Sequence, residues 1–102
     1  MQTKVEKVEL EYIPRSFYEE PKVRLMIFRE RGSAILDITH SAIAEVCQPA
    51  SEGRADMLSA FRESVPLLLQ TLNKTIAATP PGGVVIVTPK MLRQKNLRPL
   101  SR

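Results

Sequence analysis

Residues 54–78 read RADMLSAFRESVPLLLQTLNKTIAA and form the longest periodic stretch of the sequence. Apolar side chains recur there every three or four positions, which places them on one face of a helix. These residues are Met57, Phe61, Val65, Leu68, Leu72 and Ile76. We therefore predict one amphipathic helix that is long enough to cover a small sheet.

Pro66 lies inside this predicted helix. A proline there removes the hydrogen bond that its N–H would make to the carbonyl of Arg62, and its ring crowds that carbonyl. Either one helix kinks at Pro66, or Ser64 caps a second helix that carries Pro66 in its first turn. Because the apolar stripe keeps its phase across Pro66, we expect one kinked helix that wraps over a twisted sheet.

A β-hairpin is predicted upstream of this helix, around a turn that contains Gly32. Its strands cover residues 22–29 and 33–39, with apolar side chains at odd positions on the first strand and at even positions on the second. These residues are Val23, Leu25, Ile27, Ala34, Leu36 and Ile38. All six share one face in a register that pairs Ile27 with Leu36. We expect the long helix to pack on this face.

Three further elements complete the predicted fold. Residues 4–12 end in an alternating pattern, which is typical of a strand with one face in water. Residues 40–48 predict a short helix that Thr39 or Ser41 can cap. Residues 84–88 form a β-branched run without alternation, which predicts a strand that is buried on both sides or lies at an interface. The fold class is therefore α+β, with a small antiparallel sheet of three to four strands, one long kinked helix on one face and one short helix.

Length and composition predict one ordinary globular domain. The chain has 102 residues, of which 43% are hydrophobic and 25% are charged. No apolar run approaches the roughly 20 residues of a membrane span. A single cysteine allows no intrachain disulfide, so a reducing cytoplasm is the default location. With one cysteine and one histidine, a zinc site built from these ligand types is excluded, and we expect no metal and no cofactor.

The net charge of +4 is concentrated at the C-terminus. Residues 90–102 contain five basic residues and no acidic one, whereas the rest of the chain is near neutral. These residues are Lys90, Arg93, Lys95, Arg98 and Arg102. Because the segment lacks periodicity, we predict a folded domain over residues 1–89 and a flexible basic tail over residues 90–102. Such charges can neutralise phosphates, and Arg24 or Arg29 could assist them in binding nucleic acid.

Candidate catalytic residues are few. Asp37, His40 and Ser41 are the only set with the side-chain types of a hydrolytic triad, but nothing forces them toward one reactive point. We interpret them as capping and turn residues. Cys47 falls on an apolar helix face, which is typical of a small core residue. The paired glycines in residues 79–83 lack the lysine of a phosphate-binding loop, so they predict a turn. We therefore predict that the protein is not an enzyme.

Two apolar surfaces remain that one covering helix cannot both bury. One is the other face of the hairpin, and the second is the strand at residues 84–88. The candidate surface residues are Met26, Phe28, Ile35, Val84, Val85, Ile86 and Val87. Exposed apolar surfaces mark protein interfaces, so a second subunit is expected to cover them. Phe17 and Tyr18 are expected to pin their loop to the core, although an exposed contact for a partner is the alternative.

Two segments carry a resemblance to a known family. The run LDITHSA at residues 36–42 spans the end of the predicted hairpin and the start of the short helix, and the segment DMLSAFRE at residues 56–63 lies in the long helix. This order resembles a family of short bacterial proteins of unknown function, over residues 22–76, and residues 84–102 depart from it. The resemblance implies an α+β fold and a bacterial origin. The family has no established activity, so no catalytic residue can be carried over.

These observations favour a non-enzymatic, cytoplasmic protein-interaction module that forms a homodimer. The alternative is an accessory nucleic-acid-binding protein that uses the basic tail.

Overall fold

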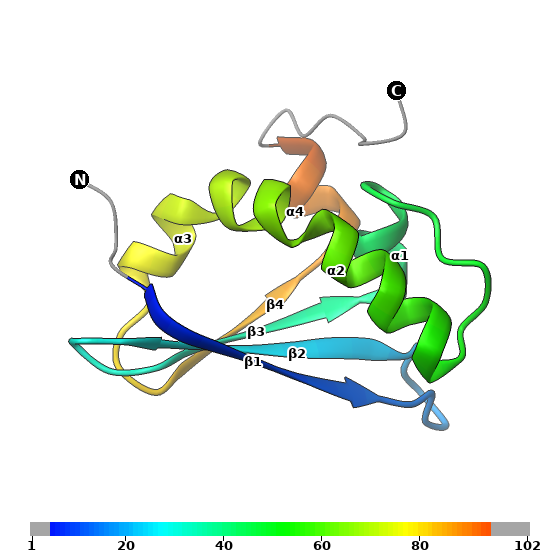
Figure 1. Ribbon diagram of the computed structural model, residues 1–102, viewed down its shortest axis with the longest axis horizontal. Coiled ribbons are helices and arrows are strands. Elements are labelled where there is room, and N and C mark those ends of the chain that lie inside the picture. The colour runs from blue at the N-terminus through cyan, green and yellow to red at the C-terminus, as the bar shows by residue number, and fades with distance from the viewer. Residues whose placement is uncertain (1–4, 95–102) are drawn as a thin grey trace.

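The computed structural model describes residues 5–94 and shows a four-stranded sheet with helices over one of its faces (Figure 1). The elements are, in order, β1 (Val5–Ile13), β2 (Lys22–Arg29), β3 (Ala34–Thr39), α1 (His40–Ala44), α2 (Arg54–Thr71), α3 (Asn73–Ala78), β4 (Gly83–Val87) and α4 (Pro89–Gln94). The strands follow one another across the sheet in the order of the sequence. The predicted α+β class is confirmed.

The sheet is mixed, and the expectation of a wholly antiparallel sheet was wrong at β4. Strands β1, β2 and β3 pair antiparallel, whereas β4 runs parallel to β3. The reason lies in the connection, because a parallel pair needs a crossover of about a dozen residues or more. Here α1, α2 and α3 cross over one face and return the chain to the start of β3, where Gly83 pairs with Ala34 (Figure 1).

The β2–β3 hairpin has the predicted face but not the predicted register. Leu25 pairs with Leu36, and Ile27 pairs with Ala34 instead of Leu36, a slip of two residues that leaves the faces unchanged. Ser33 was expected in the second strand, but it stays in the loop. Its carbonyl accepts a hydrogen bond of 2.8 Å from the Gly82 N–H, so it serves the turn before β4.

The predicted long helix is divided, and the division lies at Leu72 instead of Pro66. Helix α2 continues through Pro66 to Thr71, and α3 begins at Asn73. Leu72 has φ −96° and ψ 11°, which is outside the helical range. The prediction of continuity across Pro66 is confirmed, whereas the prediction of one helix over residues 54–78 was wrong. The break still leaves Leu72 buried in the core.

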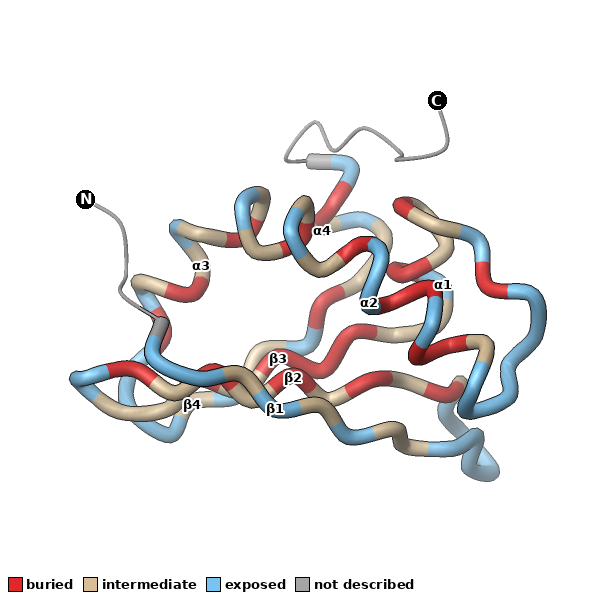
Figure 2. The backbone as a smooth tube through the Cα atoms, viewed as in Figure 1, coloured by how far each residue is buried: buried red, intermediate tan, exposed pale blue. Residues whose placement is uncertain are grey.

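The core lies between the sheet and the helices (Figure 2). The apolar stripe of α2 and α3 faces the apolar face of the hairpin, as predicted. The fully buried side chains of the core include Val23, Leu25, Ile27, Leu36 and Ile38 from the hairpin, and Met57, Phe61, Leu68 and Leu72 from the helical segment. Each such side chain contributes roughly 1.5–3 kcal/mol to folding relative to an exposed position.

The predicted short helix is shorter in the structure. Helix α1 ends at Ala44 instead of residue 48, because the chain tightens into turns in which the Val46 N–H donates to the Ile43 carbonyl. Thr39 caps it as predicted, since its Oγ1 accepts from the Ala42 N–H at 3.2 Å.

Helix α4 includes residues that were assigned to the tail. Leu92 is fully buried in the core, and the Met91 N–H donates to the Thr88 hydroxyl at 3.3 Å. Because an apolar anchor and a capping residue support α4, the domain boundary predicted at residue 89 moves at least to Gln94.

Candidate interaction surface

The face of the sheet opposite the helices carries a continuous row of apolar side chains. Met26 of β2, Ile35 of β3 and Val84 of β4 are neighbours across the three strands. Phe28 lies two residues further along β2, and Ile86 lies two residues further along β4, on the same face. We call these five residues the open-face patch.

The open-face patch is accessible to solvent. Val84 is 57% exposed and Ile86 is 59% exposed, and the other three side chains are half-buried. All helices of the described residues lie on the opposite side of the sheet (Figure 1). Contiguous apolar surface that no element covers is typical of a site of protein–protein contact.

The structure divides the predicted surface residues between the two faces of β4. Val85 packs against the core and Val87 is fully buried beneath the helices. Of the two alternatives for this strand, burial on both sides was therefore wrong, and a location at an interface stays a prediction. Successive side chains of a strand point to opposite faces, and only one face of β4 meets the helices. Five of the seven predicted residues belong to the open-face patch.

An ion pair borders the patch. Asp37 of β3 lies opposite Arg24 of β2 and next to Ile86 of β4. The Arg24 guanidinium donates to both carboxylate oxygens of Asp37, at 2.8 and 3.0 Å, and Lys22 Nζ lies 3.6 Å away. These hydrogen bonds from Arg24 lower the pKa of Asp37, so the carboxylate is charged at neutral pH. An apolar centre with a charged border is the usual anatomy of an interface.

The residues with triad chemistry are engaged separately. Asp37 is held by Arg24, as described above, whereas the Ser41 N–H and hydroxyl both donate to Glu20, at 2.7 and 2.8 Å. His40 is the first residue of α1. Within residues 5–94, no hydrogen bond joins the side chains of Asp37, His40 and Ser41. The geometry does not assemble a nucleophile, a base and an orienting acid.

The aromatic loop between β1 and β2 lies outside the core, so the expectation that it is pinned there was wrong. Phe17 and Tyr18 are each 90% exposed, and their rings pack edge to face with 4.7 Å between the ring centroids. Polar contacts hold the loop instead, because the Arg15 guanidinium donates to Glu52 at 2.7 and 2.9 Å. Tyr18 lines a shallow pocket of about 260 Å³ together with Ile86, which places the loop beside the open-face patch.

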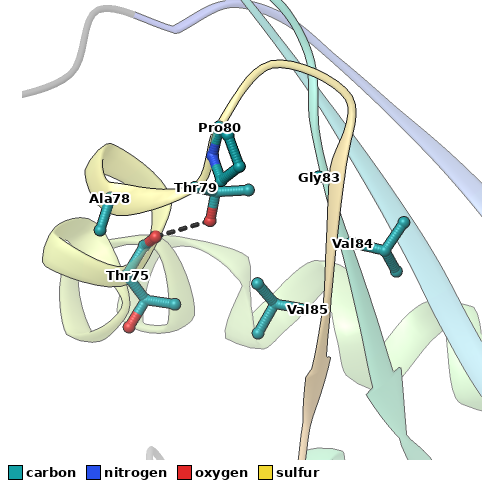
Figure 3. A pocket seen from close by; sticks show the side chains of 7 residues that line it. All are labelled: Thr75, Ala78, Thr79, Pro80, Gly83, Val84 and Val85. Carbon is teal, nitrogen blue, oxygen red and sulfur yellow. Dashed lines mark hydrogen bonds between the residues drawn. The ribbon is translucent and has the colours of Figure 1, made fainter.

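A groove lies along the outer edge of β4, between this strand and α3 (Figure 3). It has a volume of about 420 Å³ and mostly apolar walls. Its lining residues are Thr75, Ala78, Thr79, Pro80, Gly83, Val84 and Val85. The Thr79 hydroxyl donates to the Thr75 carbonyl at 2.7 Å, so it is already satisfied at the C-terminal end of α3. Sequence reasoning predicted only a turn here, because the groove forms from segments that are separate in the sequence.

The arginines proposed to assist phosphate binding have other partners. Arg24 is paired with Asp37, and Arg29 is 5% exposed and donates to backbone carbonyls. Of the tail candidates, Lys90 is exposed and Arg93 pairs with Glu45 at 3.1 Å. Lys95, Arg98 and Arg102 lie outside the described residues. Nucleic-acid binding through the tail therefore stays a prediction.

Cys47 is half-buried and is protected by its environment. Its thiol donates to a Glu63 carboxylate oxygen at 3.1 Å. This hydrogen bond and burial raise the pKa of Cys47, so the thiol form dominates at neutral pH. In the part of the chain that the structure describes, no group of three His, Cys, Asp or Glu side chains is arranged to hold a metal ion. No helix among the same residues is long and apolar enough to cross a membrane.

Comparison of the chain with protein-family models, with curated proteins and with solved structures finds no match. The resemblance to a family of short bacterial proteins therefore stays a prediction.

Proposed function

We propose that the chain is a non-enzymatic, cytoplasmic protein-interaction module that acts as a homodimer. The observation that carries this proposal is the open-face patch, an apolar strip across three strands that no described element covers. A border of paired charges is typical of a surface that is exposed to water in the monomer and contacts a second subunit in the dimer.

The chemistry of the surface favours contact with protein over catalysis. Two polar groups beside the patch, those of Arg24 and Asp37, satisfy each other in a two-pronged hydrogen-bonded pair. They supply charge at the border, whereas Val84 and Ile86 supply exposed apolar area. Contact of these apolar side chains with apolar side chains of a second subunit is the available source of binding energy.

Oligomeric state tests the proposal. Sedimentation velocity and light scattering, over a concentration series from low to high micromolar, should give the mass of a dimer. An Ile86→Lys variant should shift the protein toward monomer, because a charge then replaces an exposed apolar side chain in the patch.

A matched control places the same charge elsewhere. Gln70 is exposed on α2, away from the patch, so Gln70→Lys should leave the dimer intact. Circular dichroism verifies that each variant is folded. A wild-type protein that stays monomeric at high micromolar concentration overturns the proposal, and so does an Ile86→Lys variant that dimerises as well as the wild type.

A further inference from the structure

The two edges of the sheet are protected to different degrees. Strand β1, at one edge, has the sequence VEKVELEYI, and its charged residues would repel or solvate an approaching strand. Strand β4, at the other edge, has the sequence GVVIV, with no charge and no proline. Natural proteins place charged residues and prolines on sheet edges, because an open edge is a template for pairing with another chain. The β4 edge lacks these features.

The direction of the peptide groups in β3 follows from its pairing with β2. The His40 N–H donates to the Pro21 carbonyl at 2.9 Å, at the end of the antiparallel ladder. Because peptide groups alternate in direction along a strand, the even-numbered residues of β3 direct their backbone N–H and C=O groups toward β2. Ile35 and the other odd-numbered residues therefore direct their N–H and C=O groups toward β4.

The outward-facing groups of β4 follow in turn. In a parallel pair, a residue bonds to the two residues that flank its partner. The partner of Ile35 is Val84, so Ile35 bonds to Gly83 and Val85. The N–H and C=O groups of Val84 and Ile86 consequently point away from β3, toward the groove side of the edge.

We propose that β4 pairs edge to edge with β4 of a second copy, antiparallel about a two-fold axis at Val85, which extends the sheet through both subunits. This inference rests on the proposed homodimer and assigns it a contact at the β4 edge, which joins the two open-face patches side by side. In this register Val84 lies opposite Ile86 of the second copy, and every outward N–H and C=O of these two residues finds a partner.

Other two-fold registers satisfy fewer groups. A register centred on Val84 places Ile86 opposite Gly82 of the second copy, whose N–H is already bonded to the Ser33 carbonyl at 2.8 Å. A register centred on Ile86 brings Val84 opposite Thr88, beyond the end of the strand. The register centred on Val85 is therefore favoured.

The side chains and the groove favour a second copy as the occupant. On the open face, Val84 meets Ile86 of the other subunit, so the two open-face patches become one continuous apolar surface. On the helix side, Val85 meets its symmetry mate beside the groove, where the second strand finds space next to Thr75 and Ala78 (Figure 3). The strand carries no charge, so two identical edges approach without repulsion. A two-fold contact of this kind is self-complementary.

Engineered cysteines test the register in a Cys47→Ala background. Val85→Cys should give a disulfide-linked dimer on mild oxidation, because directly opposed residues of a non-hydrogen-bonded antiparallel pair lie about 4.5 Å apart between Cα atoms. Val84→Cys and Ile86→Cys should each stay unlinked when oxidised separately, since each is then offset by two residues from its own copy. An equal mixture of these two variants should form the linked heterodimer.

The outcomes separate this inference from the proposed function. A protein that sediments as a dimer, but links neither through Val85→Cys nor in the mixture of Val84→Cys with Ile86→Cys, overturns edge pairing and leaves the homodimer in place. A monomer overturns both. Linkage of Val84→Cys to itself overturns the register. The mixture keeps the test valid if Val85→Cys fails to fold, because Val84 and Ile86 are exposed.

Discussion

Arg29 joins three parts of the chain, and its replacement should destabilise the protein strongly. The residue lies at the end of β2 with its side chain on the helix side. Its guanidinium donates to the carbonyls of Gly32 at 2.7 Å, Ile76 at 2.7 Å and Thr79 at 3.0 Å, with Ser33 further away at 3.4 Å. The hairpin turn, the end of α3 and the approach to β4 thus meet at one side chain.

The electrostatic environment of Arg29 consists of dipoles. Its hydrogen-bond partners among the described residues are backbone carbonyls, and those at the C-terminus of a helix carry partial negative charge. Burial lowers the pKa of Arg29, and the nearby charge of Arg31 lowers it further. The guanidinium nevertheless stays charged, because its ordinary pKa is far above neutrality.

The expected loss of folding stability in Arg29→Met follows from the carbonyls that lose their hydrogen-bond donor. Ile76 keeps a bond from the Thr79 N–H at 3.1 Å, whereas the Thr79 carbonyl belongs to a buried residue and accepts from Arg29. An unsatisfied buried acceptor costs about 1–3 kcal/mol. Loss of a cation at a helix C-terminus adds up to about 2 kcal/mol, and release of a desolvated charge offsets part of this sum. We expect a net loss of about 2–4 kcal/mol.

Urea denaturation monitored by circular dichroism measures this loss as a lower midpoint with an unchanged slope. Arg29→Lys should cost at least as much as Arg29→Met, because it keeps a buried charge without the planar fork. Arg31→Met, at the exposed neighbour, is the control and should change stability by less than about 0.5 kcal/mol. The reasoning is refuted if Arg29→Met unfolds at the same urea concentration as the control.

Three further predictions concern the stability of the protein at acidic pH, the reactivity of the Cys47 thiol and the role of Pro66 in α2. The hydrogen bonds from Arg24 lower the pKa of Asp37 below the value of 3.8 that an isolated group has, so this contribution is present above that pH and is lost as the pH falls through the folded pKa. Unfolding free energies measured between neutral pH and about pH 3 should fall more steeply for the wild type than for Asp37→Asn, and parallel curves would contradict this. Alkylation of Cys47 by iodoacetamide should be slow at neutral pH and several-fold faster in Glu63→Gln, because the carboxylate raises the thiol pKa; equal rates would exclude that cause. Pro66→Ala should stabilise the protein by about 1–3 kcal/mol in thermal unfolding, since α2 is helical on both sides of this residue, and a lower melting temperature would show that the proline is needed.

Period-two alternation predicts the faces of the hairpin but not its register. Leu25 and Leu36 share a face in any pairing that shifts by two residues, so the core was predicted correctly with the wrong partners. The observed register keeps Ser33 in the loop, where its carbonyl accepts from the Gly82 N–H. Gly82 follows three intervening helices in the sequence, so this contact forms only when the whole chain has folded. A local pattern contains no information about such a contact.

The orientation of β4 depended on distant segments in the same way. A uniform apolar run such as residues 84–88 is compatible with burial on one face or on both. The distinction between Val84 and Val85 arises only when α2 and α3 cross one face of the sheet and leave the other open (Figure 1). The candidate surface was therefore predicted in part, and the groove at its edge was not predicted at all.

Arg29 shows that a usable signal was present in the sequence. Its odd number places it on the same face as Val23, Leu25 and Ile27, so the alternation that predicts an inward direction for those three predicts it for Arg29 as well. The prediction that Arg29 assists phosphate binding followed from its charge alone and ignored its position on the inward face of β2. A guanidinium that points inward needs acceptors, and the carbonyls at the end of a covering helix are the ones that a helix leaves unpaired. The last turn of α3 was therefore the expected place for Arg29 once a helix covers that face, and its hydrogen bond to the Ile76 carbonyl lies there.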